Sequence, residues 1–162
     1  MIRVATAECF THGKVAREIH AFSMGYPLNY NWKISAELVL VAGLFIPTLS
    51  GVRNILGFEP PMPRATINDI KVYGEEEDEE VALMMARAVR ELADSDIGIG
   101  TTAGIGRGGI AIASRDRWDV INSEVHADLR YPDTERILER QKSGIQRALQ
   151  LLESFIVDFK DR

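Results

Sequence analysis

The sequence predicts an α/β protein, built as a three-layer α/β/α sandwich around a mixed sheet. Two observations lead to this prediction. Short runs of apolar and β-branched residues alternate with segments in which apolar residues recur at helical spacing. Later in the chain, two apolar runs are joined by a glycine-rich loop, which favours an antiparallel pair of strands. A length of 162 residues, with 46% apolar and 27% charged residues, fits one domain spanning residues 1–162.

The first segment is expected to form a strand, a turn and a helix. Residues Ile2 to Ala7 include β-branched side chains typical of a strand, and helical spacing begins after Thr11. Thr11, or the turn before it, can cap this helix. Three charged residues are expected on the solvent-exposed face of the helix: Lys14, Arg17 and Glu18. The turn that connects the strand to the helix contains Cys9, the single cysteine of the chain.

A second strand and helix are expected to follow. The continuous apolar run from Leu38 to Ile46 predicts an interior strand, and Thr48 is a candidate N-cap for a short helix that ends at Gly57. The proline-rich stretch from Glu59 to Pro63 predicts an extended connection. Two alternatives stay open for Ile67 to Tyr73, a short strand or an extended arm.

The second half of the sequence predicts a helix, three strands and a long terminal helix. The acidic block Glu75 to Glu80 precedes apolar residues at helical spacing, so its charges are expected in the first helical turn, where they complement the helix dipole. The strands are expected at 97–100, 110–113 and 118–129, and an amphipathic helix is expected from about Asp133.

Composition and charge exclude several classes of function. The chain has 19 basic and 24 acidic residues, a net charge of -5 and no stripe of Lys and Arg, so we expect no nucleic-acid polymer as a partner. The apolar window Leu38 to Leu49 contains Pro47 and is far shorter than the roughly 20 residues of a membrane span, so we expect no membrane association. One cysteine forms no internal disulfide, and Met1 to Thr6 do not resemble a signal peptide, which together predict a cytoplasmic location.

Cys9 and His12 are the candidate catalytic residues. A cysteine between a strand and a helix N-terminus lies where backbone N–H groups and the helix dipole stabilise a thiolate. His12, three residues later, can hydrogen-bond the sulfur and activate it. The alternatives are that Cys9 packs inertly in the core and that His12 points into solvent. The three histidines and one cysteine have no spacing typical of zinc ligands, so no metal site is expected.

The loop from Thr101 to Gly109 is the candidate ligand-binding element. It contains four glycines and Arg107, a combination that suits close backbone approach to an anionic or planar ligand. It lacks the Gly-Lys-Ser/Thr of a Walker loop, and a strand follows it instead of the helix of a dinucleotide-binding motif. The alternative is a flexible turn between strands. The predicted ligand-binding residues come from this loop and from the Cys9 turn: Thr6, Glu8, Thr11, Gly13, Thr101, Thr102, Gly104, Gly106, Arg107 and Gly108.

Nearly the whole chain resembles the C-terminal domain of the competence-damage-inducible CinA proteins, the nicotinamide-mononucleotide amidohydrolase family. The segments that carry the resemblance are Ala7 to Gly13, Ala42 to Gly57 and Thr102 to Gly106. The resemblance implies a three-layer sandwich, usually a homodimer. Three positions depart from the family: its nucleophilic serine is replaced by Cys9, and its tyrosine and lysine fall on Pro47 and Val52. The loss of a phenol and an amine weakens the case for amide hydrolysis.

A closer resemblance is to the HcgF family of methanogens, which is associated with the iron hydrogenase of methanogenesis. Three motifs of that family are intact, at Ala7 to Lys14, Gly43 to Arg53 and Thr101 to Ile110. This resemblance implies a step in the biosynthesis of the iron-guanylylpyridinol cofactor. In that step a partner enzyme adenylates the carboxyl group of guanylylpyridinol, and the cysteine of the family, which is Cys9 here, holds the acyl group as a thioester. Guanylylpyridinol is then a ligand, and no tightly bound cofactor is expected.

Three functions therefore stay open at this point. The first is formation of a thioester on Cys9 during cofactor biosynthesis. The second is hydrolysis of a nucleotide-linked amide, as by a nicotinamide-mononucleotide deamidase, with Cys9 as nucleophile and Glu8 or His12 as the base. The third is ligand binding without catalysis, with Cys9 as a packing residue.

Overall fold

A computed structural model describes residues 1–160 of the chain. Its main sheet has five strands in the order β2-β1-β5-β7-β8. The first three of these run parallel: β1 (Ile2–Glu8), β2 (Leu38–Phe45) and β5 (Ile97–Thr102). The other two continue the sheet in antiparallel pairs: β7 (Gly109–Ala113) and β8 (Trp118–Ile121). The sheet is therefore mixed, as the glycine-linked apolar runs predict.

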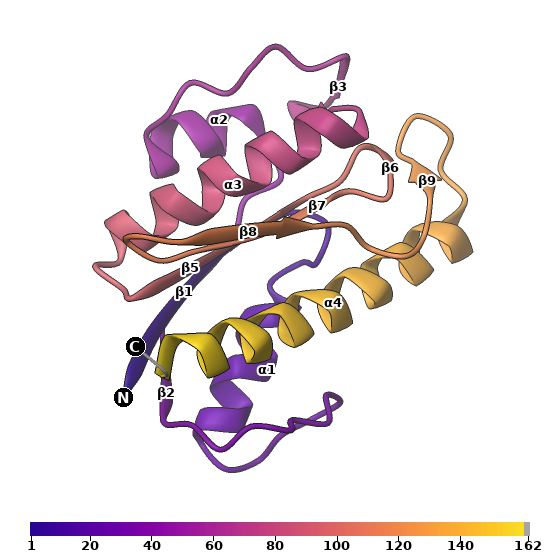
Figure 1. Cartoon of the computed structure of the whole chain (residues 1–162). Helices are drawn as coiled ribbons and strands as arrows, with labels where there is room; N and C mark the ends of the chain where they lie inside the picture. Colours follow the sequence, from indigo (N-terminus) through magenta and orange to yellow (C-terminus); the bar gives the residue numbers. More distant parts are fainter. Residues whose placement is uncertain (161–162) are drawn as a thin grey trace.

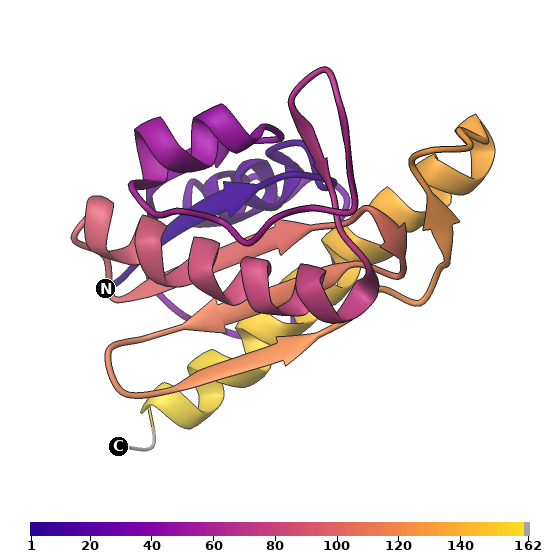
Figure 2. The ribbon, with the colours of Figure 1, turned by 90° about the horizontal axis from the view of Figure 1, so that it is seen from above.

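Helices cover both faces of this sheet (Figure 1). One face carries α1 (Lys14–Ser23) and α4 (Thr134–Lys160). The other carries α3 (Glu75–Leu92) together with α2 (Leu49–Gly51) and the π-helical turn η1 (Val52–Leu56). Seen from above, α3 runs along β5 and β7 (Figure 2). This arrangement confirms the predicted three-layer α/β/α sandwich.

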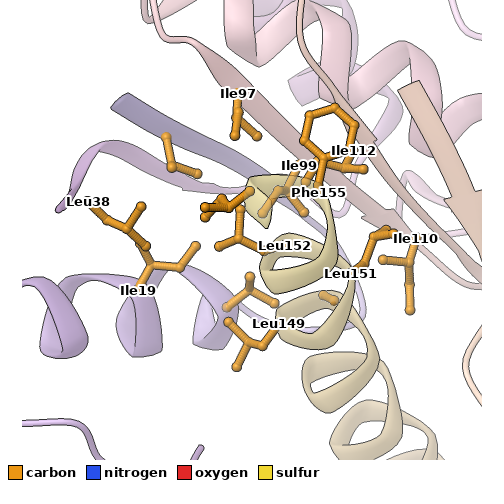
Figure 3. Close-up of a cluster of buried hydrophobic side chains, with 14 of the residues drawn as sticks. Ile19, Leu38, Ile97, Ile99, Ile110, Ile112, Leu149, Leu151, Leu152 and Phe155 are labelled. Atoms are coloured by element: carbon orange, nitrogen blue, oxygen red, sulfur yellow. The ribbon is translucent and has the colours of Figure 1, made fainter. Parts of the chain in front are cut away.

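The core between the sheet and the layer of α1 and α4 is built from alternate residues of the central strands. Ile97 and Ile99 of β5 are buried there with Ile110 and Ile112 of β7. They pack against three residues of α4: Leu149, Leu152 and Phe155 (Figure 3). The predicted apolar face of the terminal helix thus contacts the sheet.

The opposite face of β5 is formed by glycines, which bring α3 unusually close. A Cβ atom added to Gly98 would lie 2.0 Å from the carbonyl oxygen of Ala86, and one added to Gly100 would lie 2.1 Å from that of Ala82. Neither position has room for a side chain. The spacing between α3 and the sheet is therefore set by the sequence Ile-Gly-Ile-Gly of β5.

Two predictions about burial are wrong. The run Leu38 to Ile46 forms β2, but β2 is an edge strand with one exposed face, and Phe45 at its end is 52% exposed. Glu18 is not on a solvent-exposed face of α1, because its buried carboxylate accepts hydrogen bonds from the backbone N–H groups of Asn29 and Tyr30 at 3.0 and 3.4 Å. An apolar run by itself does not distinguish an edge strand from an interior one.

The segment that follows η1 forms a hairpin. Of the two alternatives for Ile67 to Tyr73, a short strand or an extended arm, the short strand is correct. Strand β3 (Ala65–Ile67) pairs with β4 (Ile70–Val72) through a two-residue turn in which Asn68 and Asp69 both have positive φ. The hairpin contacts the start of α2 through a bridge between Thr48 and Ile70. Thr48 caps α2 as predicted, since its Oγ1 accepts from the N–H of Gly51 at 3.0 Å.

A second small ribbon extends from the glycine-rich loop. Strand β6 (Ile105–Gly106) pairs with β9 (Ala127–Asp128). The strand predicted at 118–129 is thus divided into β8 and β9 by an irregular segment. The consequence is that the glycine-rich loop is held on both sides and is not a free turn.

Candidate functional site

Cys9 lies directly after β1, at the carboxyl edge of the three parallel strands. Its backbone N–H donates to the carbonyl oxygen of Thr101 at 2.9 Å and to Oγ1 of the same residue at 3.2 Å. The Cys9 residue is only 5% exposed. In parallel α/β sheets this edge is where ligands bind, so the position suits a functional cysteine.

The neighbouring Glu8 is completely buried and accepts four hydrogen bonds. Its Oε1 accepts from the hydroxyl of Thr11 at 2.6 Å and from the N–H of Val15 at 3.0 Å. Its Oε2 accepts from the hydroxyl of Thr6 at 2.9 Å and from the N–H of Ala16 at 3.1 Å. Burial raises the pKa of Glu8, and these bonds oppose the shift. Glu8, and not Thr11, therefore satisfies the N-terminal amides of α1.

This capping changes the expected source of Cys9 activation. The N–H groups at the start of α1 are occupied by Glu8, and the helix begins five residues after the cysteine, behind a left-handed Gly13 with φ 78°. The prediction that the N-terminus of α1 stabilises a Cys9 thiolate is therefore wrong. Gly13 acts through its backbone conformation, which L side chains rarely adopt.

His12 also differs from its predicted role. Its ring packs against Phe45 with a centroid distance of 4.9 Å, and among residues 1–160 no hydrogen bond joins the ring to Sγ of Cys9. Partial burial, with a smaller effect of Lys14, lowers the pKa of His12. The histidine is consequently a neighbour of the cysteine turn and not its hydrogen-bonded base.

The glycine-rich loop and the Cys9 turn are joined into one unit. The hydroxyls of Thr11 and Thr101 are 2.8 Å apart. Gly104 lies so close to β4 that an added Cβ would be 2.6 Å from backbone atoms of Tyr73. Gly106 and Gly108 have φ of 113° and 82°. The predicted ligand-binding residues on the two segments are thus brought together, although several of the glycines are already explained by packing and backbone conformation.

Arg107 is less available to a ligand than the sequence suggests. Its Nε and Nη2 donate to Oε1 and Oε2 of Glu75, both at 2.9 Å. This two-point ion pair lowers the pKa of Glu75 to about 2. A hollow of about 500 Å³ lies beside Arg107 and is lined also by Ser123 and Arg147. A ligand that used the Arg107 guanidinium would compete with the Glu75 carboxylate.

Three buried charged residues beside the site were not predicted from the sequence: Lys71, Asp78 and Arg140. Arg140 of α4 is 1% exposed. Its Nη1 donates to three carbonyl oxygens, those of Gly104 at 3.0 Å, Gly106 at 2.9 Å and Ala127 at 3.0 Å. Its Nε is buried and forms no hydrogen bond in the described part of the chain. The glycine-rich loop is therefore folded around a guanidinium.

Asp78 lies in the first turn of α3 and is fully buried. Its Oδ2 accepts from the N–H of Gly104 at 2.8 Å, whereas its Oδ1 has no hydrogen-bond partner within residues 1–160. Burial raises the pKa of Asp78 to about 7, although the hydrogen bond from Gly104 and the charges of Lys71 and Arg140 oppose the shift. Asp78 is consequently a carboxyl group that titrates near neutral pH.

Lys71 of β4 brings a buried amine to the same edge of the sheet. The residue is 1% exposed, and its Nζ donates to the carbonyl oxygens of Ile46 at 3.3 Å and Pro47 at 3.4 Å. The hairpin thus contributes a buried amine beside the end of β2.

Helical periodicity could have indicated two of these residues. Asp78 continues the buried stripe of α3 one turn toward its N-terminus from Val81 and Ala82. Arg140 lies on the apolar face of α4, one turn before Gly144. A charge within an apolar stripe predicts a buried, partnered group. Lys71 gives no such indication.

A longer groove of about 1000 Å³ lies between α1, the segment 29–34 and α4. Lys14 and Gln141 lie at its wall and are joined by a hydrogen bond of 3.3 Å. Within the described residues no cluster of three His, Cys, Asp or Glu side chains could hold a metal ion. None of the helices in that part of the chain is long and apolar enough to cross a membrane.

A family model described as FeGP cofactor biosynthesis protein HcgF matches residues 1–156. The chain belongs to the HcgF family. Its relatives include a UPF0254 protein of Methanothermobacter thermautotrophicus, 72% identical over 156 residues that cover 96% of this chain and 99% of that protein. A UPF0254 protein of Methanocorpusculum labreanum is 49% identical over 161 residues, covering 98% and 94%. Membership of the HcgF family indicates a role in cofactor biosynthesis.

Solved structures with the same fold as this HcgF protein come from the CinA superfamily. A competence or damage-inducible protein from Enterobacter asburiae superimposes with a TM-score of 0.60 at 19% identity, covering 94% of this chain and 86% of that one. A CinA superfamily protein from Klebsiella pneumoniae gives a TM-score of 0.60 at 16% identity, covering 97% and 88%. These likenesses confirm the predicted CinA-like fold and say nothing further about activity.

Proposed function

We propose that this HcgF protein is the acyl acceptor in iron-guanylylpyridinol biosynthesis, and that Cys9 forms a thioester with the carboxyl group of guanylylpyridinol after a partner enzyme has adenylated it. The observation that carries the proposal is the position of Cys9. It is the single cysteine, it follows β1 at the carboxyl edge of the parallel strands, and Thr101 fixes its backbone.

The chemistry needs few protein groups. The sulfur of Cys9 attacks the acyl carbon, a C–S bond forms, and the bond from that carbon to the phosphate oxygen breaks. AMP departs with the bonding electrons, and because it is a good leaving group the step needs no strong general acid. The product is expected to resist hydrolysis because Glu8, whose two oxygens are occupied by four donors, is not arranged to activate a water molecule.

Binding of the ligand is assigned in this proposal to the turn and the glycine-rich loop. Thr11 and Thr101 lie beside Cys9 at the edge where the reacting carboxyl group must approach, and the proposal assigns the rest of the ligand to the loop that contains Gly106. Arg107 joins only if a ligand anion displaces Glu75, with which it forms two hydrogen bonds. The proposal further includes a homodimer in the cytoplasm and no tightly bound cofactor.

Hydrolysis of a nucleotide-linked amide is the weaker alternative. It needs a base that activates the nucleophile or a water molecule. Glu8 has both oxygens occupied by four donors, and the ring of His12 packs on Phe45. Neither residue is arranged as a base for Cys9, so turnover of nicotinamide mononucleotide is not expected.

The deciding experiment is intact-protein mass spectrometry after incubation with guanylylpyridinol, ATP and the adenylating partner. We expect a mass increase equal to the acyl group, sensitive to hydroxylamine and absent from Cys9→Ala. The matched control is Thr66→Ala, an exposed position on β3. No adduct on the wild-type protein, with the partner shown to release pyrophosphate, would contradict the proposal and favour ligand binding without catalysis.

A further inference from the structure

We propose that Lys71, Asp78 and Arg140 form a buried charge cluster that holds Cys9 as a thiolate. The inference deepens the proposed function, because a thiolate and not a thiol attacks an acyl-adenylate. It also replaces the helix N-terminus of α1, which is occupied by Glu8, as the source of activation.

The direction of the Cys9 side chain follows from the strand. Side chains alternate along β1, and Ala5 and Ala7 pack in the core next to Tyr73 and α3. Glu8 points to the opposite side, where it caps α1. The backbone of Cys9 continues the pairing with Thr101, so its side chain shares the side of Ala5 and Ala7. This is the side on which Lys71 and Asp78 lie.

Arg140 reaches the cysteine turn from α4, on the other face of the sheet. Its Cζ lies 5.9 Å from the ring centroid of Phe10, the residue after Cys9. One helical turn later, Gly144 touches that ring so closely that an added Cβ would lie 2.3 Å from Cε2. Three carbonyl oxygens fix Nη1, and Nε remains without a partner. Burial lowers the pKa of Arg140, and the acidic groups beside it, Asp78 first and Asp128 among them, oppose this shift.

The cluster holds two buried cations, Lys71 and Arg140. The acidic groups that face them are Asp78, which carries its negative charge only above its raised pKa of about 7, and Asp128, which faces Arg140. A buried charge without a counter-charge is costly, so the surplus favours a thiolate on Cys9. The thiol S–H bond breaks, the electron pair stays on sulfur, and the proton passes to solvent.

The other ionisable groups near the cysteine have partners of their own, although Asp128 also faces Arg140. Glu8 is satisfied by four donors on the opposite side of the strand, and Asp128 pairs with Arg130 at 2.9 Å. His12 is exposed and packs on Phe45. Lys14 points toward α4, where it donates to Gln141.

The test is the pH profile of Cys9 alkylation by iodoacetamide between pH 5 and 10, followed by intact mass. Access to the sulfur changes the plateau rate, whereas ionisation changes the midpoint. Lys71→Met removes a cation and is expected to move the midpoint up by about one pH unit, a tenfold change in ionisation. Asp78→Asn removes the anion and is expected to move it down. The control Arg53→Met removes an exposed cation paired with Glu59 and is expected to leave it unchanged.

Opposite shifts in the two variants support the cluster, since a loss of packing would not change sign with charge. Equal midpoints in both, or a wild-type midpoint at or above the approximately 8.5 of a free cysteine, would overturn it. Asp78→Asn nearly preserves shape, so it decides the question even if Lys71→Met does not fold. The assay uses neither guanylylpyridinol nor the partner enzyme. A responsive midpoint without an acyl adduct would therefore refute the proposed function alone.

Discussion

Two buried carboxylates flank the Cys9 turn, and they differ in how many donors they meet. Glu8 accepts four hydrogen bonds, two from backbone amides and two from hydroxyls. Asp78 accepts one, from Gly104, and keeps one oxygen without a partner. A carboxylate whose oxygens are all satisfied fixes structure, whereas one with a bare oxygen beside buried cations remains able to exchange a proton.

Removing the carboxylate of Glu8, whose two oxygens are both hydrogen-bonded, should have the largest effect on stability. Glu8→Ala leaves two backbone N–H groups and two hydroxyls buried without partners, so we expect the free energy of unfolding to fall by about 3 to 5 kcal/mol. Glu8→Gln keeps one acceptor oxygen and should lose less. Urea titration followed by circular dichroism measures both. A loss under about 1 kcal/mol for Glu8→Ala would show that water replaces the carboxylate.

Protonation of the second carboxylate, that of Asp78, should make the free energy of unfolding depend on pH. The pKa of Asp78 is raised from 3.8 to about 7 in the folded protein, so the folded state binds more protons than the unfolded state between these values. The contribution of Asp78 to the free energy of unfolding is fully present below about pH 4. It is lost as pH rises to about 7, by up to about 1.4 kcal/mol per pH unit. Asp78→Asn removes this slope.

Urea titrations of the wild-type protein and Asp78→Asn at pH 4.5 and 7.5 measure this difference. The variant should gain stability relative to wild type at the higher pH. A difference that does not depend on pH would mean that Asp78 stays ionised throughout, and the contrast with Glu8 would then disappear.

A partly exposed carboxylate, that of Glu75, sharpens the comparison with a pH effect of opposite sign. The pKa of Glu75 is lowered to about 2 by Arg107, so the pair stabilises the protein above about pH 4.5 and loses this contribution as pH falls toward 2. Both side chains are partly exposed, so Arg107→Ala should cost only about 0.5 to 1 kcal/mol at pH 7. Thermal unfolding at pH 7 and pH 2.5 should show a smaller cost at the lower value. A constant cost would indicate lost packing.

The sequence predicts the layers of this fold more completely than the interior of its site. The order of strands and helices, the position of Cys9 in a turn and the capping of α2 by Thr48 follow from local patterns, and the structure confirms them. The edge position of β2 does not, because strand order depends on pairing between distant segments.

Lys71 and Arg140 show why local sequence patterns do not reveal the whole site. They lie 69 positions apart in the sequence, and both come near Cys9 only through the packing of the hairpin and of α4. Arg140 lay within an apolar helical stripe, a pattern that predicts a buried partner without saying which one. Lys71 resembles any exposed lysine of a short strand until the fold covers it.

The glycines of β5 determine more than the local strand. Gly98 and Gly100 admit no side chain beneath α3, so this helix rests on the sheet at a fixed height. Asp78 belongs to the first turn of that helix, and Gly104, whose N–H donates to Asp78, lies two residues after the end of β5. The two glycines therefore set the distance between α3 and the sheet. Any larger residue at either position would move α3 away and separate the carboxylate of Asp78 from the N–H of Gly104. A substitution remote from Cys9 would then alter the charged groups around the cysteine.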